Sequence, residues 1–287
     1  CIMVYSTMKN TYIKEVQEDR MPIAQAIRDA QKAGSFIRKM FEEGAALKKQ
    51  HGSDKVFDFS IGNPDVEPPK EFHDTLLRLV NEDAPGSHGY MPNPGYPFVR
   101  DALAKKVSRE HKVQVDGTNI IMSVGAAGAL NSVLKAILNP GDEVIVSKPY
   151  FVEYGSYISN HGGKMILVES DSDFNLNTDA IASALNEKTA AVLINSPHNP
   201  TGKVYPLKNI QALASVLREH GDSCGRYPYL IADEPYREIV YGGLEAAPIL
   251  SEYEESIVVT SYSKSLSLPG ERIGYIAVGP KARELPE

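Results

Sequence analysis

The sequence predicts an α/β fold in which a mostly parallel, seven-stranded sheet is covered by helices on both faces. From about residue 118, seven short β-branched runs alternate with longer amphipathic stretches. The runs are apolar on both faces, as in strands that are covered on two sides. Repeated units of strand and helix favour parallel pairing. The first 60 residues contain no such runs, so we expect them to form an arm or part of a second, smaller domain.

The expected elements follow one another without an internal repeat. The strands are expected at 119–123, 143–147, 164–168, 190–195, 229–233, 256–260 and 273–278, with amphipathic helices at 127–138 and 207–220. Cys224 lies in the sequence Gly-Asp-Ser-Cys-Gly-Arg, which favours a loop. Residues 23–50 are charged and helix-rich, and 56–64 run extended into a Gly/Pro turn. We interpret 1–57 as the N-terminal arm and small-domain segment, and 58–287 as the large domain.

Composition excludes several classes of protein. A chain of 287 residues with 42% apolar side chains can bury a large core. Its 30 basic and 37 acidic side chains give a net charge of -7, which argues against a general nucleic-acid surface. The apolar stretch 119–138 is too interrupted to cross a membrane, and no export signal is evident. Two cysteines, Cys1 and Cys224, cannot form a disulfide framework, so we expect a cytoplasmic protein.

Polar groups follow four of the seven expected strands, at the edge where open α/β sheets bind ligands. They are Gly125-Ala126-Ala127 after the first strand, His198-Asn199-Pro-Thr-Gly after the fourth, Asp233-Glu234-Pro-Tyr236 after the fifth and Ser261-Tyr-Ser263-Lys264 after the sixth. Each alone has an ordinary interpretation: close helix packing, a surface turn, a solvated carboxylate or an exposed lysine.

Together, these groups suit one kind of ligand. A flat, phosphorylated heterocycle that carries an aldehyde would suit all of these groups: an amine, a carboxylate, an amide, a glycine-opened helix and the nearby Arg272. The sequence lacks both the Gly-rich dinucleotide fingerprint and a P-loop, and we expect no metal site.

These motifs resemble those of the class I/II aminotransferases of pyridoxal-phosphate fold type I. The resemblance rests on Gly-Tyr90-Met-Pro-Asn-Pro-Gly, His-Asn-Pro-Thr-Gly at 198, Asp-Glu-Pro-Tyr at 233, and Ser-x-Ser-Lys with an arginine eight residues after the lysine. It covers the chain from about residue 58 to its end, with all motifs in the family's order. Each motif is modest by itself, but the set is highly specific.

The resemblance implies a transaminase that moves an amino group from an L-amino acid to a 2-oxo acid. Lys264 would bind pyridoxal 5'-phosphate as an internal aldimine and later move the proton at the substrate's α-carbon. Asp233 would keep the pyridine nitrogen protonated, so that the ring accepts electrons. Tyr236 and Asn199 would bond the phenolic oxygen of the cofactor. Phe151 would stack on its ring, a position that the neighbouring Tyr150 could also fill.

The same resemblance implies a phosphate site, a substrate site and a dimer. Backbone amides of Gly125, Ala126 and Ala127 would hold the phosphate with Ser261, Ser263 and Arg272, whose planar fork suits phosphate oxygens. Many family members have a hydroxyl residue in the first loop, and this sequence has none there. Tyr90 would reach the phosphate of a neighbouring subunit, which implies a homodimer with shared sites. Gly62 and Asn199 are assigned to the substrate.

Family members usually continue for another hundred or so residues. That part completes the small domain and supplies an arginine for the substrate's carboxylate, so we expect that arginine beyond residue 287. The chain is therefore expected to be a fragment or a truncated form. The sequence leaves three alternatives open: a lyase or cyclase on the same fold, a truncated form that binds the cofactor with little turnover, and a non-catalytic regulatory domain.

Overall fold

The structure is a computed structural model that describes residues 23–24, 27–28, 35–57 and 62–282. The chain divides into two compact units, Cys1–Asn63 and Pro64–Glu287. The first unit contains α3 (Ser35–His51) and the short 3-10 helix η1 (Ser53–Lys55) within its described residues. Helix α3 lies inside the stretch expected to be helix-rich. Cys1 and residues 58–61 of the expected extended run 56–64 lie outside the described residues.

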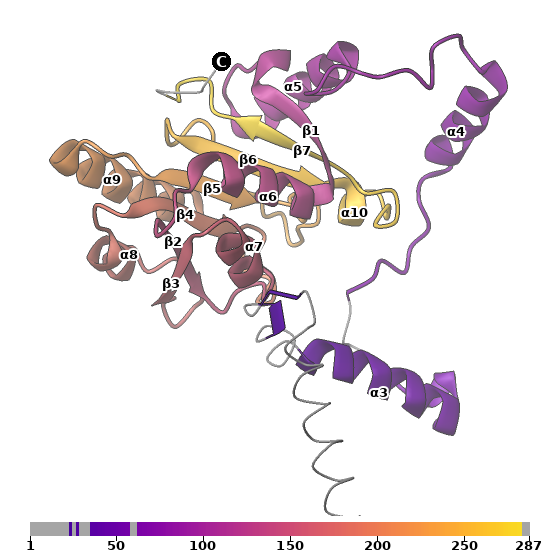
Figure 1. The fold of residues 1–287 in the computed structure, drawn as a ribbon, viewed down its shortest axis with the longest axis horizontal. Helices are drawn as coiled ribbons and strands as arrows, with labels where there is room; N and C mark the ends of the chain where they lie inside the picture. Colours follow the sequence, from indigo (N-terminus) through magenta and orange to yellow (C-terminus); the bar gives the residue numbers. More distant parts are fainter. Residues whose placement is uncertain (1–22, 25–26, 29–34, 58–61, 283–287) are drawn as a thin grey trace, which may run out of the picture. The chain divides into compact units, whose positions relative to one another are not determined.

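The second unit is built on a seven-stranded sheet, as the sequence predicted (Figure 1). The strand order is β1-β7-β6-β5-β4-β2-β3. The strands are β1 (Ile120–Val124), β2 (Glu143–Lys148), β3 (Lys164–Glu169), β4 (Thr189–Asn195), β5 (Tyr229–Asp233), β6 (Ser256–Ser261) and β7 (Ile273–Val278). Each begins and ends within one residue of its expected bounds.

Strand β7 is the antiparallel strand that makes the sheet mostly, and not fully, parallel. It pairs antiparallel with both β1 and β6, whereas β6, β5, β4, β2 and β3 pair in parallel. Six strands therefore end at one edge of the sheet, and β7 begins there. The residues that precede β7 join the loops that follow the other strands.

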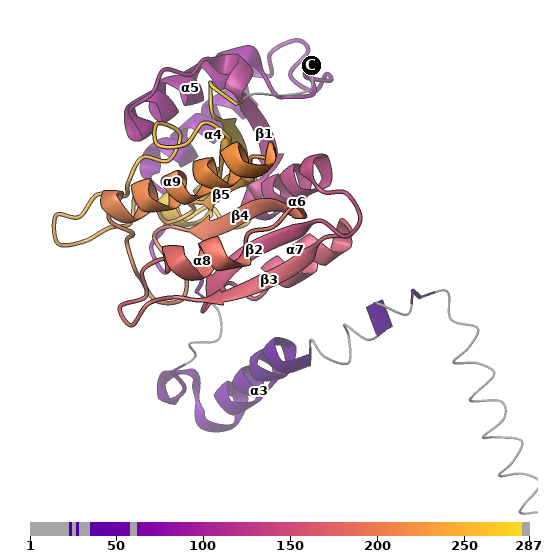
Figure 2. The ribbon, with the colours of Figure 1, turned by 90° about the vertical axis from the view of Figure 1, so that its left-hand side faces the viewer.

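Helices cover both faces of the sheet (Figure 2). Apolar residues of α5 (Pro97–His111), α8 (Thr178–Ala184) and α9 (Leu207–Cys224) belong to one buried cluster. Those of α6 (Gly125–Ile137) and α7 (Tyr154–Asn160) belong to a second cluster. The strands contribute to both clusters, for example Ile145 to the first and Val144 to the second. This two-sided burial explains why the strand sequences are apolar on both faces.

Three further elements complete the unit. The 3-10 helix η2 (Gly117–Asn119) leads into β1, and the one-turn helix α10 (Tyr262–Ser265) follows β6. Helix α4 (Lys70–Glu82) lies in the segment before α5 and buries none of its side chains. Within the described part of the chain, no helix combines the length and the apolar character needed to cross a membrane.

The expectation that Cys224 lies in a loop was wrong. Helix α9 continues four residues beyond the expected end at His220 and includes Cys224 as its last residue. Gly225 ends the helix, since its backbone adopts the left-handed conformation (φ 77°) and its N–H bonds the carbonyl of Gly221. The stop signal in this sequence was therefore the glycine after the cysteine.

Candidate active site

The sheet brings the four polar strand ends together at one edge. Asn195 at the end of β4 is in register with Asp233 at the end of β5, and Asp233 is in register with Val259 near the end of β6. Val124 at the end of β1 is in register with Ile273, the first residue of β7. Residues that are more than a hundred positions apart in the sequence therefore lie on neighbouring strands.

Asp233 is a buried carboxylate with one oxygen in use. Its side chain is only 6% exposed, and the Tyr154 hydroxyl donates a hydrogen bond of 2.7 Å to its Oδ2. Its Oδ1 is buried and has no hydrogen-bond partner among the described residues. Burial raises the pKa of Asp233 from 3.8 to about 7; the Tyr154 bond opposes this shift and the charge of Glu234 adds to it. A buried, unpaired acceptor indicates a missing donor.

Lys264 lies on α10, directly after β6. Burial lowers the pKa of its amine, so the neutral form that attacks a carbonyl is more accessible than in a solvated lysine. Ser261, the residue before the helix, and Ser263 within it are both buried. Strands β5 and β6 are hydrogen-bonded neighbours, so Lys264 and Asp233 follow adjacent strand ends.

Asn199 and Tyr236 approach each other from the loops after β4 and β5. The Asn199 amide donates a hydrogen bond of 3.5 Å to the Tyr236 hydroxyl. The backbone N–H of Asn199 donates to Asn195 Oδ1 at 2.6 Å, and the Asn195 amide donates to the carbonyl of Asp233 at 2.7 Å. Asn195 therefore links the two loops. Burial, and then the charge of Asp233, raises the pKa of Tyr236.

The N-terminus of α6 and Arg272 form a second part of the site. Gly125 begins α6 with a left-handed backbone (φ 68°), and a Cβ added there would lie 2.7 Å from Arg272 Nη2. Arg272 also has a left-handed backbone (φ 54°), an unusual conformation for a residue with a side chain. Its Nη1 donates to the carbonyl of Pro269 at 2.9 Å. Ala126 and Ala127 occupy the rest of the first helical turn and, with Gly125, present backbone N–H groups and small side chains.

Gly274 is a part of this site that the sequence reasoning missed. A Cβ at this position would lie 2.6 Å from the carbonyl oxygen of Thr260 and 2.7 Å from the backbone carbon of Gly125. Only glycine therefore lets β7 pass so close to β6 and to the start of α6. The signal that could have identified it was the sequence Arg272-Ile-Gly274, in which a glycine interrupts an otherwise apolar strand.

Two tyrosines of α7 were also missed. Tyr154 is 1% exposed and holds Asp233. Burial raises the pKa of Tyr157. The charges of Glu153 and Asp233 raise it further and that of Arg272 lowers it, so the Tyr157 hydroxyl interacts electrostatically with both Asp233 and Arg272. The spacing of three residues places both tyrosines on one side of α7, which could have indicated their role.

Phe151 precedes this helix, is partly buried and packs edge-on against Tyr154 at 5.5 Å between ring centroids. Tyr150, the alternative to Phe151, packs against the same cluster.

Tyr90 and Gly62 are the remaining residues assigned from the sequence. Tyr90 is fully exposed on the segment between α4 and α5. Gly62 belongs to the first unit, so it has no defined position relative to the sheet.

Comparison with known proteins agrees with the motifs. Residues 54–284 match the family described as "Aminotransferase class I and II". An aspartate/prephenate aminotransferase of Thermus thermophilus is 36% identical over 235 residues, which are 81% of this chain and 58% of that protein. An aspartate aminotransferase of Geobacillus stearothermophilus is 33% identical over 245 residues, 83% of this chain and 60% of that protein. The chain thus spans about three fifths of the length of these relatives.

The chain belongs to the class I and II aminotransferase family.

Solved structures of aminotransferases share its fold. An aminotransferase from Eubacterium rectale superimposes with a TM-score of 0.87 at 36% identity and covers 92% of this chain, with 67% of the other chain matched. The Thermus thermophilus aspartate aminotransferase with maleate gives a TM-score of 0.75 at 33% identity, over 85% of this chain and 62% of the other.

The family's cofactor is pyridoxal phosphate, and the residues of this chain fit it. The free Oδ1 of Asp233 is a buried acceptor that suits a protonated ring nitrogen. The glycine-opened start of α6 beside Arg272 suits a phosphate, because bare N–H groups, the helix dipole and a guanidinium all favour an anion. Lys264 supplies a primary amine on the strand end next to that of Asp233.

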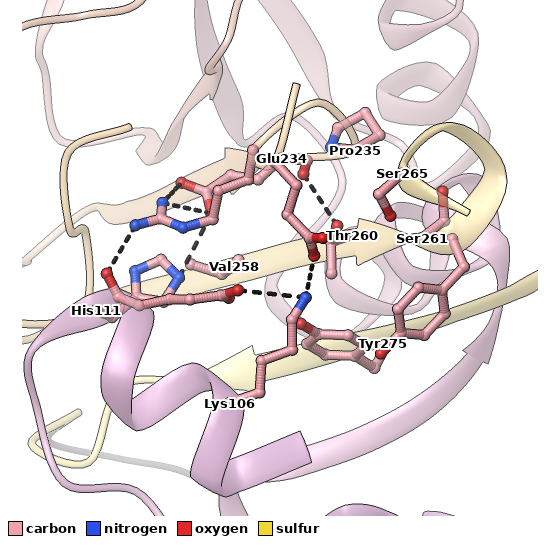
Figure 3. Close-up of a pocket in the computed structure, with 13 residues that line it drawn as sticks. Lys106, His111, Glu234, Pro235, Val258, Thr260, Ser261, Ser265 and Tyr275 are labelled. Atoms are coloured by element: carbon pink, nitrogen blue, oxygen red, sulfur yellow. Dashed lines mark hydrogen bonds and ion pairs between the residues drawn. The ribbon is translucent and has the colours of Figure 1, made fainter. Parts of the chain in front are cut away.

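A pocket on the other face of β5 and β6 is not this site (Figure 3). It is lined by charged residues of α5 and of the loop after β5, among them Lys106, His111 and Glu234, and shares Ser261 with the candidate cofactor site. Its volume of about 10 Å³ is room for little more than one water molecule. An amino acid or a cofactor therefore cannot occupy it.

Proposed function

We propose that this protein is a pyridoxal-phosphate-dependent aminotransferase that moves an amino group from an L-amino acid to a 2-oxo acid. The observation that carries the proposal is the buried Asp233 carboxylate, whose Oδ1 lacks a partner, on the strand next to the one that leads into Lys264. A carboxylate held in this way suits a protonated ring nitrogen. Its place beside a partly buried amine supports a cofactor that joins the two.

When bound, the cofactor accepts the electron pair left by the α-proton and carries the amino group between the two substrates. Lys264 Nζ is the proposed attachment point for its aldehyde and, as a neutral amine, moves the proton at the substrate's α-carbon. Asp233 Oδ1 accepts a hydrogen bond from the protonated pyridine nitrogen and holds that proton in place. The hydrogen bond from Tyr154 leaves Oδ1 available and orients the carboxylate.

The remaining residues bind and orient. Tyr236 and Asn199, which contact each other, are proposed to bind the phenolic oxygen. Asn199 is also proposed to contact the substrate. Phe151 is proposed to cover the ring face. The N–H groups of Gly125, Ala126 and Ala127, the hydroxyls of Ser261 and Ser263, and Arg272 are proposed to bind the phosphate. The backbone of Gly62 is proposed to contact the substrate's carboxylate.

The proposal also covers the domain organisation, the oligomeric state and the cellular location. Residues 1–57 would form the arm and small-domain segment, and 58–287 the large cofactor-binding domain. The active unit would be a homodimer in which Tyr90, fully exposed here, reaches the partner's phosphate site. A cytoplasmic location is consistent with only two cysteines in the sequence.

The direct test is to trap the cofactor on the chain. Pyridoxal phosphate is added to the purified 287-residue protein, the adduct is reduced with borohydride, and the labelled lysine is located by peptide mapping. We expect the label on Lys264, its loss in Lys264→Ala, and an unchanged label in Lys188→Ala. Lys188 is the matched control because it is exposed and precedes β4 at the opposite edge of the sheet. A label elsewhere on a folded protein would contradict the assignment.

Substrates are tested next, in single turnover. L-aspartate comes first because several relatives are named aspartate aminotransferases. We expect an amino acid to convert the bound cofactor and release a 2-oxo acid, and a second 2-oxo acid to reverse the change. Release of ammonia or pyruvate without an acceptor would favour the lyase or cyclase alternative.

A further inference from the structure

Glu234 lies directly after Asp233, but its side chain is on the opposite face of the sheet. Successive residues at a strand end point to opposite faces, and the contacts agree with this rule. Asp233 contacts Tyr154 of α7, whereas Glu234 Oε2 lies 3.4 Å from His111 Nε2 of α5. The Glu234 side chain is 1% exposed, although carboxylates are almost never so buried unless they are paired.

Two partners hold this buried carboxylate (Figure 3). Arg237 Nη1 donates to Oε1 at 2.9 Å and to Oε2 at 3.0 Å. His111 Nδ1 accepts the backbone N–H of Ile249 at 3.0 Å, so the neutral ring carries its proton on Nε2, the nitrogen that faces Glu234. Arg237 therefore donates both hydrogen bonds to the Glu234 carboxylate, and the N–H side of the His111 ring lies against it, with Nε2 3.4 Å from Oε2.

Arg237 connects Glu234 to two further parts of the chain. Its Nη2 donates to the carbonyl of Glu110 at 2.8 Å, at the end of α5, and to that of Ala246 at 3.2 Å. Its Nη1 also donates to the carbonyl of Ala247 at 3.1 Å. The guanidinium thus ties the loop after β5 to α5 and to the segment that leads to β6.

The ion pair closes a turn around Tyr236. The N–H of Arg237 bonds the carbonyl of Glu234 at 3.2 Å, so both the backbone and the side chains join these two residues. The Thr260 hydroxyl donates to the same carbonyl at 3.0 Å, and the N–H of Glu234 donates to the carbonyl of Val259 at 2.8 Å. Tyr236 lies inside this turn, and its hydroxyl accepts the hydrogen bond from Asn199.

We propose that Glu234 is a positioning residue for the cofactor site: through Arg237 and His111 it holds the turn 234–237, so that Asp233 and Tyr236 face the cofactor. This inference rests on the proposed function, because it concerns how the cofactor's contacts are held. Glu234 acts by fixing the position of the turn 234–237, and not through its charge. Groups that orient ligand-binding side chains from behind commonly change affinity strongly when they are removed.

Two substitutions separate the mechanical effect from a charge effect. Glu234→Gln removes a negative charge and Arg237→Gln removes a positive charge, but both break the same ion pair. If charge alone mattered, the anionic cofactor would bind more tightly to the first variant and more weakly to the second. If position matters, both variants bind it more weakly, and the double variant loses less than the product of the two single losses.

The measurement is titration of the full chain with pyridoxal phosphate, followed by its visible absorption band, for wild type and variants. We expect the Kd to rise about tenfold in each single variant, as for other second-layer contacts, with a shift of the band maximum in the same direction in both. Opposite changes in Kd, or no change in either variant, would overturn the proposal.

Glu238→Gln is the matched control. Glu238 lines the same pocket and pairs with Lys106, but it is half-exposed and lies outside the turn. We expect its Kd and band to equal those of wild type, and a change as large as that of Glu234→Gln would overturn the assignment to the turn.

Two further measurements keep the outcomes distinct. If Glu234→Gln does not fold, Arg237→Lys keeps the positive charge but loses the two-pronged contact, and it should weaken binding in the same way. A wild-type chain that shows no saturable band and no label on Lys264 would contradict the proposed function itself. A wild-type chain that binds and labels normally, with unaffected Glu234 and Arg237 variants, would contradict only the positioning role.

Discussion

At the scale of single residues, Asp233 shows how burial prepares a side chain for one partner. The carboxylate is placed where water does not reach one of its oxygens, and its hydrogen bond from Tyr154 leaves Oδ1 available. In isolation such a group favours its protonated form, and a pKa of about 7 reflects this preference. A cationic partner at Oδ1 would restore the charged form. The unbound chain is therefore poised to bind a group that brings a proton or a positive charge.

The raised pKa predicts a pH dependence of stability for the unbound chain. The pKa of Asp233 is 3.8 ordinarily and about 7 in the folded chain, so the folded form binds more protons between these values. The free energy of unfolding should therefore fall as pH rises through this window, by about 1.4 kcal/mol per pH unit from this group. Asp233→Asn should remove that part of the slope. Urea unfolding of both proteins at pH 5, 6, 7 and 8 measures the difference, and parallel curves would contradict it.

Tyr154→Phe tests the bond that orients Asp233. The variant leaves a buried carboxylate without its donor, so it should cost about 1–3 kcal/mol of stability. Because the Tyr154 bond lowers the pKa of Asp233, its loss should move that pKa further upward. The pKa can be followed by the carboxyl infrared band or by side-chain NMR. Tyr157→Phe, on the same helix, is the control; an equal shift in both variants would show that the hydrogen bond is not responsible.

At the scale of elements, the antiparallel strand β7 makes the phosphate end of the site possible. Because β7 begins where its neighbours end, Arg272 reaches the start of α6 while β6 delivers Ser261 and Lys264. Gly274 allows this arrangement, since β7 there lies against the backbones of Thr260 and Gly125. Two left-handed residues, Gly125 and Arg272, accommodate the close approach. The site is thus formed by the packing of one helix start over one strand.

Gly274→Ala should disturb this packing. The added methyl group would overlap backbone atoms of β6 and of α6, which cannot rotate away as a side chain can. We expect a loss of about 1–3 kcal/mol in stability and a weaker affinity for pyridoxal phosphate, because α6 and Arg272 would separate. Gly270→Ala is the control: it lies in the loop that precedes β7, and a Cβ there meets no atom within 4 Å. Equal effects of the two variants would show that the close approach is unimportant.

At the scale of the whole molecule, the sheet carries every part of the proposed cofactor site except Tyr90. The helices and strands of the second unit form two buried clusters, one on each face, which hold the strand ends in place. Tyr90 is fully exposed outside these clusters. In the proposed homodimer, it would complete the site of the partner chain.

Mixing two variants, each impaired in a different way, tests this shared site. Tyr90→Ala should weaken cofactor binding and Lys264→Ala should abolish covalent attachment. A dimer of one chain of each kind contains one site with both residues intact. After mixing and refolding in equal amounts, about a quarter of all sites should therefore regain native affinity and borohydride labelling. Sedimentation of the wild-type chain checks that it dimerises, and a mixture no better than its components would contradict shared sites.

Much of the fold could be predicted from the sequence because most local signals agreed with the final structure. The strands were found to within a residue because they are buried on both faces and therefore read as continuous apolar, β-branched runs. The motifs around Asp233, Lys264 and Asn199 could be placed on one edge because parallel strands share that edge. The end of α9 was misplaced because its stop signal, Gly225, follows Cys224 in a run of turn-forming residues.

The sequence by itself determined the sheet, the family and the residue types available for chemistry, since these depend on patterns between near neighbours in the chain. Only the tertiary structure decided which other residues hold the site side chains in place. Tyr154 lies 79 residues from Asp233, and Gly274 fits between backbones that come from β6 and α6. The network of Glu234, Arg237 and His111 spans more than 120 residues of sequence. Contacts of this kind depend on strand order and on which face each residue takes, and no local pattern in the chain encodes that pairing.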